Sequence, residues 1–183
     1  MDEDPPWLND EEQQVWLQLS LLMTRLPAAL ERQLQHDSGV SLYEYLLLSG
    51  LSMTPERRLR LRDLADFTGT SLSRLSNVVR KLEARGWLTR VPDPQDGRST
   101  YAVLTDAGYA TVVEAAPGHV REVRKLVFDP LSAGQLRRLG GAIRQVLDAV
   151  DPGGCDPNAL LHPDPGACYA DAEPPTTAST SSP

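Results

Sequence analysis

Apolar side chains recur at helical spacing near the start of the chain and predict a long first helix. Asp10 is expected to be its N-cap, with acidic residues in the first turn, and Gly39 is expected to end it. Pro27 lies inside the pattern and is expected to kink or split the helix. The apolar residues that recur at this spacing are Val15, Trp16, Leu19, Leu22, Met23, Leu26, Leu30 and Leu34.

The middle of the chain predicts three shorter helices. One is expected at 42–49, capped by Ser41, and a loop follows at 50–55. A short helix at 60–67 ends in a turn at Gly69. A further helix then runs from a cap at Ser71 to about Arg85. The inward positions of these helices are predicted as Tyr43, Leu46, Leu47, Leu61, Leu64, Ala65, Leu72, Leu75, Val78, Val79 and Leu82.

The pattern changes after Gly86, where two strands at 87–91 and 100–104 are expected on either side of the polar segment PDPQDGRS. Thr105 is predicted to cap a long helix that is broken near 117–118 and continues to Phe128. Ser132 is predicted to cap the last helix, which carries the apolar residues Leu136, Leu139, Ile143, Val146 and Leu147.

The order of elements over residues 60–108 is that of a winged helix-turn-helix, in which a second helix enters the DNA major groove and a hairpin lies beside it. The fold class expected is therefore mainly α with a small β-wing. Five segments follow from this interpretation. They are an acidic disordered lead (1–9), an N-terminal dimerisation helix (10–38), the winged helix-turn-helix (39–108), C-terminal dimerisation helices (109–150) and an acidic, disordered tail rich in Pro, Gly, Ser and Thr (151–183).

The formal net charge of −7 argues against nucleic acid only until its distribution is examined. Residues 1–12 hold six acidic groups and residues 151–183 hold five, and neither segment has a Lys or Arg. The rest of the chain then has 14 acidic and 18 basic groups, and residues 57–98 alone have ten basic and five acidic ones. Because phosphate binding depends on local positive charge, this region is the candidate DNA-binding surface.

The polar face of the helix that begins at Ser71 supplies the candidate base and phosphate contacts. Arg pairs with guanine and Asn with adenine in the major groove, and small hydroxyls permit a close approach. Arg80 and Lys81, one turn further on, are better placed for phosphates. In the wing, Arg98 suits a narrow minor groove, and Asp96 is expected to orient it. The predicted DNA-contacting residues are Ser71, Ser73, Arg74, Ser76, Asn77, Arg80, Lys81, Asp96 and Arg98.

The winged helix-turn-helix over residues 60–108 is called the reading unit below. The long helices at both ends of the chain lie outside it and need a surface to cover their apolar faces. A two-fold homodimer would cover them and would place two reading helices about 34 Å apart, which implies a palindromic operator. The alternative is a monomer whose two ends cover its own core.

The chain resembles the MarR family of bacterial transcriptional regulators over roughly residues 10–150. SRLSNVVRKLEARGW (73–87) is similar to the recognition helix of that family, and DPQDGRSTYAVLTDAG (93–108) is similar to its wing and the exit from the wing. The resemblance implies a homodimer that binds a palindromic operator, usually as a repressor, and often releases DNA when a small phenolic or lipophilic effector binds. It assigns DNA contact to Ser73, Arg74, Ser76, Asn77 and Arg98, and support of the wing to Asp96. Gln95 stands where many members have a basic residue, so fewer phosphate contacts are expected from the wing.

Effectors of that family lodge between the dimerisation helices and the reading unit. The candidates here are Trp16, Met23, Tyr43, Tyr45 and Trp87, although such an apolar set is more often part of a core. The three histidines are scattered and both cysteines lie in the tail, so neither a metal nor another cofactor is predicted.

The remaining functional classes are disfavoured by the sequence. It contains no nucleophile elbow, phosphate-binding glycine loop or HExxH motif, so an enzyme is not indicated. A winged helix that binds only protein stays open as the alternative, but it would predict a neutral reading face. No apolar run approaches the length of a membrane span and the acidic start lacks the features of a secretory signal, so a cytoplasmic protein is expected.

Overall fold

The computed structural model describes residues 5–94, 96 and 99–152. Its elements in order are α1 (Asp10–Ser38), α2 (Leu42–Ser52), η1 (Pro55–Arg57), β1 (Arg58–Arg60), α3 (Leu61–Phe67), α4 (Leu72–Ala84), β2 (Leu88–Pro92), β3 (Thr100–Leu104), α5 (Asp106–Val123), η2 (Arg124–Phe128) and α6 (Ala133–Val150). Most of the predicted acidic tail, the first residues of the lead and Arg98 lie outside the described residues. No helix in the described part is long and apolar enough to cross a membrane.

Side-chain caps place most of the helix starts where the sequence predicts them. The hydroxyls of Ser41, Ser71, Thr105 and Ser132 each accept a hydrogen bond from the backbone N–H three residues further on. The first helix is the exception, because its N-cap is Asn9 and not Asp10. The Asn9 side chain accepts from the Glu12 N–H at 2.9 Å, and the Glu12 carboxylate accepts from the Asn9 N–H at 2.8 Å. Two orphan N–H groups are thereby satisfied by one reciprocal pair.

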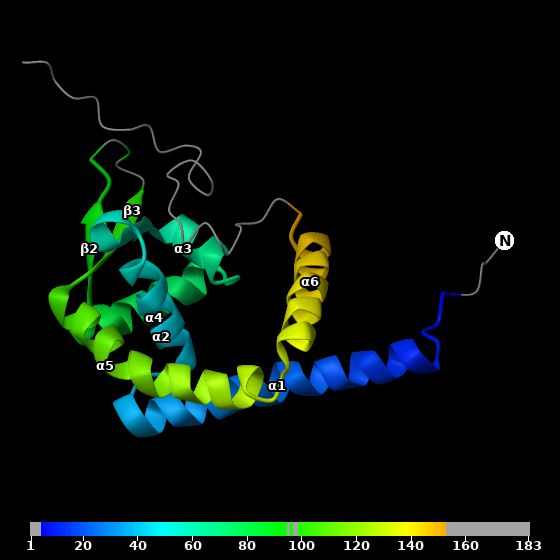
Figure 1. The fold of residues 1–183 in the computed structure, drawn as a ribbon. Coiled ribbons are helices and arrows are strands. Elements are labelled where there is room, and N and C mark those ends of the chain that lie inside the picture. The colour runs from blue at the N-terminus through cyan, green and yellow to red at the C-terminus, as the bar shows by residue number, and fades with distance from the viewer. Residues whose placement is uncertain (1–4, 95, 97–98, 153–183) are drawn as a thin grey trace, which may run out of the picture.

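Both long helices continue through their prolines, so the break predicted near 117–118 is wrong. Helix α1 is not split at Pro27, and α5 is not broken near Pro117 but runs on to Val123, where the π-helical turn η2 begins. A proline removes one backbone hydrogen bond, and tertiary packing can offset that loss. Here α5 lies along α1 (Figure 1), and Gly118 packs so closely that a Cβ would lie 3.1 Å from the Gln33 side chain of α1.

Helix α2 also extends beyond its predicted end, into the segment 50–55 that was expected to be a loop. Gly50 was interpreted as a loop residue, but it is buried inside the helix, and a Cβ there would lie 2.7 Å from the Phe67 ring of α3. The residue therefore permits the close approach of α2 and α3. Leu51, one position further on, is fully buried, so the last turn of α2 packs in the core.

A three-stranded antiparallel sheet in the order β1-β3-β2 adjoins these helices. Strand β1 was not predicted. The third helix was expected to begin at Arg60, but Arg60 is the last residue of β1 and the N-cap of α3. The pairing aligns Leu59 of β1 and Arg90 of β2 with Ala102 of β3. The strand that follows η1 is thus held by a partner far along the chain.

The core lies where α2, α3, α4 and the sheet meet the C-terminal part of α1 and the start of α5. Two predicted inward residues do not belong to it, since the side chains of Leu46 and Leu72 are about half exposed. The helix α2 is rotated so that Tyr45 and Leu48 face inward instead. The fully buried large side chains are Leu34, Val40, Leu47, Leu48, Leu51, Leu64, Leu75, Val79, Leu82 and Leu88.

Candidate nucleic-acid interface

The turn between α3 and α4 sets the angle at which α4 leaves the core. Gly69 adopts a left-handed conformation with φ +60°, which suits a residue without a Cβ. The N–H of Thr70 then donates to the carbonyl of Ala65 at 3.0 Å, and Ser71 caps the next helix. Leu75, Val79 and Leu82 are fully buried and anchor one side of α4, so its opposite side faces solvent.

The structure brings the seven predicted contact residues of α4 and its N-cap onto this solvent side. All are exposed except Ser76, which is half-buried. The Arg80 Nη1 donates to the Asn77 Oδ1 at 3.1 Å and so orients the amide. An amide oxygen has two lone pairs, so the Asn77 Oδ1 can accept from Arg80 and still has one acceptor site left. The Ser71 and Ser73 hydroxyls lie 3.2 Å apart at the start of the helix.

Five of the arginines counted in the basic region are paired with carboxylates of the protein, and two of these pairs, those of Arg60 and Arg90, connect the sheet to the helices. Arg90 of β2 donates to both oxygens of Glu83 at the end of α4, with the shortest contact 2.7 Å from Nη2 to Oε2. These bonds lower the pKa of the Glu83 carboxyl. Arg60 is paired with Asp93. These two pairs connect the sheet to α3 and α4. Counting charges in the sequence could not distinguish such structural arginines from those on the exposed face of α4.

The base of the wing is closed around Asp93, whose side chain is 2% exposed. Its Oδ2 accepts from Arg60 Nη2 at 3.0 Å and from Arg60 Nε at 3.1 Å. Further along the wing, the Asp96 carboxylate accepts from the Ser99 hydroxyl at 2.7 Å, and its carbonyl accepts from the Ser99 N–H at 2.8 Å. Asp96 thus supports the turn of the wing. The position of Arg98 is outside the described residues, so its role stays a prediction.

The start of α2 links the long helix α1 to the end of α4. The Glu31 carboxylate of α1 accepts from the Leu42 N–H at the first turn of α2. In the same turn, the Glu44 carboxylate lies 3.5 Å from Arg85 Nη1, and the Arg85 guanidinium covers the Trp87 ring at 4.8 Å. These contacts connect α1, through the first turn of α2, to the C-terminal end of α4.

Comparison with known proteins gives a consistent result for this arrangement. A model of the MarR family matches residues 38–99. The crystal structure of Sco3205, a MarR family transcriptional regulator from Streptomyces coelicolor in complex with DNA, is 42% identical, with a TM-score of 0.79 over 82% of this chain and 94% of that one. The chain belongs to the MarR family.

A second MarR family regulator from Streptomyces coelicolor, AbsC, is 33% identical, with a TM-score of 0.75 over 79% of this chain and 97% of that one. Among curated proteins, the uncharacterized HTH-type transcriptional regulator YdcH of Bacillus subtilis is 34% identical over 74 residues, which is 40% of this chain and 46% of that protein. The chain thus spans about half the length of the curated relatives that it matches. The winged-helix fold predicted from the sequence is confirmed.

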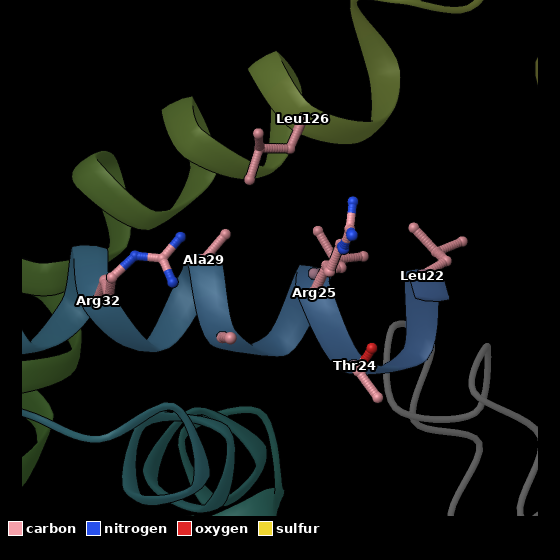
Figure 2. A pocket seen from close by; sticks show the side chains of 8 residues that line it. Leu22, Thr24, Arg25, Ala29, Arg32 and Leu126 are labelled. Carbon is pink, nitrogen blue, oxygen red and sulfur yellow. The ribbon is translucent and has the colours of Figure 1, made fainter. Parts of the chain in front are cut away.

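The MarR-type flanking helices leave a groove between α1 and η2. Figure 2 shows Arg25 and Arg32 on either side of Ala29, with Leu126 facing them from η2. The wall between the two guanidinium groups is mostly aliphatic. The groove is lined by Leu22, Thr24, Arg25, Leu26, Ala28, Ala29, Arg32 and Leu126.

None of the five residues predicted to contact an effector lines this groove. Trp16 and Met23 are exposed on α1, and Trp87 is half-buried beneath Arg85. The Tyr43 hydroxyl lies 3.1 Å from the Thr68 Oγ1, and the Tyr45 ring lies 4.5 Å from the His119 ring of α5. Their part in effector binding stays a prediction. Within the described residues, no group of His, Cys, Asp and Glu could hold a metal ion.

Proposed function

We propose that the protein is a sequence-specific, DNA-binding transcriptional regulator that acts as a repressor and binds a palindromic operator as a homodimer. One observation carries the proposal. The exposed face of α4 presents hydroxyl, amide and guanidinium groups, and its cations have no carboxylate partner within the described residues. Most charges elsewhere in the reading unit are paired within the protein. The exposed face of α4 is therefore the surface with charged and polar groups available for phosphates and bases.

The position of each side chain along α4 suggests its role. Ser73 and Arg74 lie in the first turn, which in a helix-turn-helix points toward base edges, and Arg74 is suited to guanine. Asn77 is suited to adenine, and Arg80 orients its amide. Arg80 and Lys81 would then contact phosphates. Arg98 would enter the minor groove beside a wing that Asp96 supports.

The homodimer is supported by the apolar surface that the flanking helices expose. Helix α6 has no buried residue, although its leucines, valines and isoleucine form a stripe along it. The N-terminal half of α1 likewise exposes Trp16, Leu22 and Met23. Uncovered apolar area of this extent marks an interaction surface, and a two-fold partner would cover both stripes at once. This would also bring two reading helices onto successive turns of one operator.

Control by a small effector belongs to the same proposal. The groove between α1 and η2 has an aliphatic wall and two guanidinium groups, so it suits a small apolar molecule that carries an anionic group. The contact of Glu31 with α2, and of Glu44 with Arg85, would transmit a shift of α1 to the reading helix.

A DNA-retardation experiment tests the central proposal. The purified protein is mixed with a duplex from upstream of its own coding sequence and with a shuffled duplex of equal composition, at several salt concentrations. We expect preferential retention of the natural duplex, and weaker binding with an intact dimer for Arg98→Ala. Equal affinity for both duplexes, or no retention at low salt, would favour the alternative of a winged-helix protein-interaction module.

A further inference from the structure

The unpaired positive charge of the reading unit gathers on α4. Arg74, Arg80 and Lys81 are all exposed, and none of them forms an ion pair within the described residues. Most of the arginines around them differ in this respect, although Arg62 of α3 also forms no ion pair within the described residues. Those that are paired with a carboxylate are Arg57, Arg58, Arg60, Arg85 and Arg90. An anion that approaches the reading unit therefore finds its strongest unneutralised field at α4, and the N-terminal end of the helix adds to that field.

The same chain carries a segment of the opposite charge. Residues 151–183 hold five acidic groups and no Lys or Arg. They carry a net negative charge, which a phosphate-binding surface attracts. Its acidic residues are Asp151, Asp156, Asp164, Asp171 and Glu173.

The point at which this segment leaves the described fold permits it to reach α4. Helix α6 runs from the layer of α1 and α5 toward the side on which α3 and the sheet lie (Figure 1), and it ends at Val150. The chain beyond Pro152 has 31 residues. A stretch of that length spans about 100 Å when fully extended, and roughly 30 Å on average as a flexible coil. Both lengths are comparable with, or larger than, the dimensions of a domain of this size.

We propose that the acidic segment 151–183 binds the cationic face of α4 and competes with DNA for it. This inference rests on the proposed DNA-binding function. Each exposed contact between the segment and α4 is weak, but tethering keeps the acidic groups at an effective concentration of about 1 mM. Non-specific DNA binding depends almost entirely on phosphate contacts, so it is the binding that the segment weakens most. An operator adds base contacts and displaces the segment, which makes the segment a device for specificity.

The affinity for DNA tests the competition in the full-length chain. The variant Asp156→Asn/Asp164→Asn/Asp171→Asn/Glu173→Gln removes four of the five charges, and a matched control keeps the composition of 153–183 in scrambled order. The probe is a fluorescent duplex of mixed sequence. We expect the neutral variant to bind it roughly two- to tenfold more tightly at about 50 mM salt, and the difference to vanish at several times that concentration. The scrambled control should behave as the natural chain does.

The possible results separate the two proposals. If the natural and neutral chains both bind the duplex with equal affinity, the competition is wrong while the proposed function stands. If neither chain binds the duplex at low salt, the proposed function itself fails. Tighter binding by the neutral variant would support the competition, but repulsion at a distance gives the same result, so the site of docking needs a second measurement.

The cysteines provide that measurement, because Cys155 and Cys168 are the only two in the chain. A nitroxide is attached to Cys168 in a Cys155→Ser background, and broadening of backbone amide signals is recorded without DNA. We expect broadening over residues 73–81 that added salt removes. The variant Arg74→Gln/Arg80→Gln/Lys81→Gln should lose it, and the matched variant Arg137→Gln/Arg138→Gln/Arg144→Gln on α6 should keep it. Broadening confined to α6, or none anywhere, would overturn the proposal.

Discussion

Arg60 and Asp93 form a two-point contact at the base of the wing, with Arg60 Nη2 and Nε 3.0 and 3.1 Å from Asp93 Oδ2. The two residues belong to different parts of the chain, since Arg60 ends β1 and Asp93 follows β2. Strand β3 lies between β1 and β2, so the pair spans the sheet from one edge to the other. The wing therefore takes its position from the start of α3, one element before the reading helix.

Replacement of Asp93 should loosen the wing. Asp93→Ala leaves the Arg60 guanidinium without its buried partner, and we expect the free energy of unfolding to fall by about 1–3 kcal/mol. DNA affinity should fall as well, because the wing loses its anchor. Urea unfolding followed by circular dichroism measures the first effect. Asp66→Ala is the control, because Asp66 is exposed and its side chain forms no hydrogen bond or ion pair within the described residues. Equal losses in the two variants would contradict the prediction.

Two substitutions on α4 should separate base contact from phosphate contact. Arg74→Ala should cost about 1–3 kcal/mol on the operator and reduce the preference for it over a shuffled duplex. Lys81→Ala should weaken binding to both duplexes alike and lower the slope of log affinity against log salt by about 1. Fluorescence anisotropy across a salt series measures both quantities. Loss of sequence preference in Lys81→Ala, with none in Arg74→Ala, would reverse the roles assigned here.

A charge on the apolar stripe of α6 should separate the protomers. Ile143 is about half exposed in the single chain and would be buried by a partner. Burial of an unpaired carboxylate is strongly unfavourable, so Ile143→Glu should raise the dimer dissociation constant at least tenfold, or about 1.4 kcal/mol. Sedimentation velocity over a range of concentrations measures it. Gln145→Glu places the same charge on the neighbouring polar side of α6 and should leave the dimer intact. A dimer that survives Ile143→Glu would place the interface elsewhere.

Stability should depend on pH through His119. Burial lowers the pKa of this imidazole from its ordinary value of 6.5, and its Nδ1 has no hydrogen-bond partner among the described residues. Because the unfolded chain binds the proton more readily, the contribution of the neutral ring is complete above pH 6.5 and is lost as the pH falls below it. His119→Phe keeps an aromatic ring against Tyr45 without titration. Its Tm should therefore fall less than that of the natural chain between about pH 7 and pH 5. If His119→Phe and the natural chain lost stability in parallel, another group would be responsible for the acid sensitivity.

Local interactions explain why much of the helix pattern was predictable. A side-chain cap needs only the three or four residues that follow it, so Ser41, Ser71, Thr105 and Ser132 were identified correctly. The left-handed turn at Gly69 is equally local. The polar face of α4 follows from its period alone, which is why its candidate contact residues were found on one side of one helix.

The prediction errors arose where distant parts of the chain meet. Strand β1 has three residues and exists because β3, about 40 residues later, pairs with it. Gly50 and Pro117 are residue types that are common in loops. Both lie inside helices here, because α3 packs against α2 at Gly50 and α1 packs against α5, which contains Pro117. Leu72 was assigned to the core from its spacing, and only the packing of α4 shows that its side chain is half exposed.

The amino-acid sequence by itself therefore determined the order of the helices, the winged helix-turn-helix and the face of α4 that presents polar groups, because hydrophobic period and capping act over a few residues. Only the tertiary structure decided which of the cationic side chains are unpaired and so available for DNA phosphates. Arg60 and Arg90 count as positive charge in the sequence, yet Asp93 and Glu83 neutralise them in the fold. An ion pair depends on the distance between two charged groups in space, and residues 7 or 33 positions apart acquire that distance only when the sheet forms.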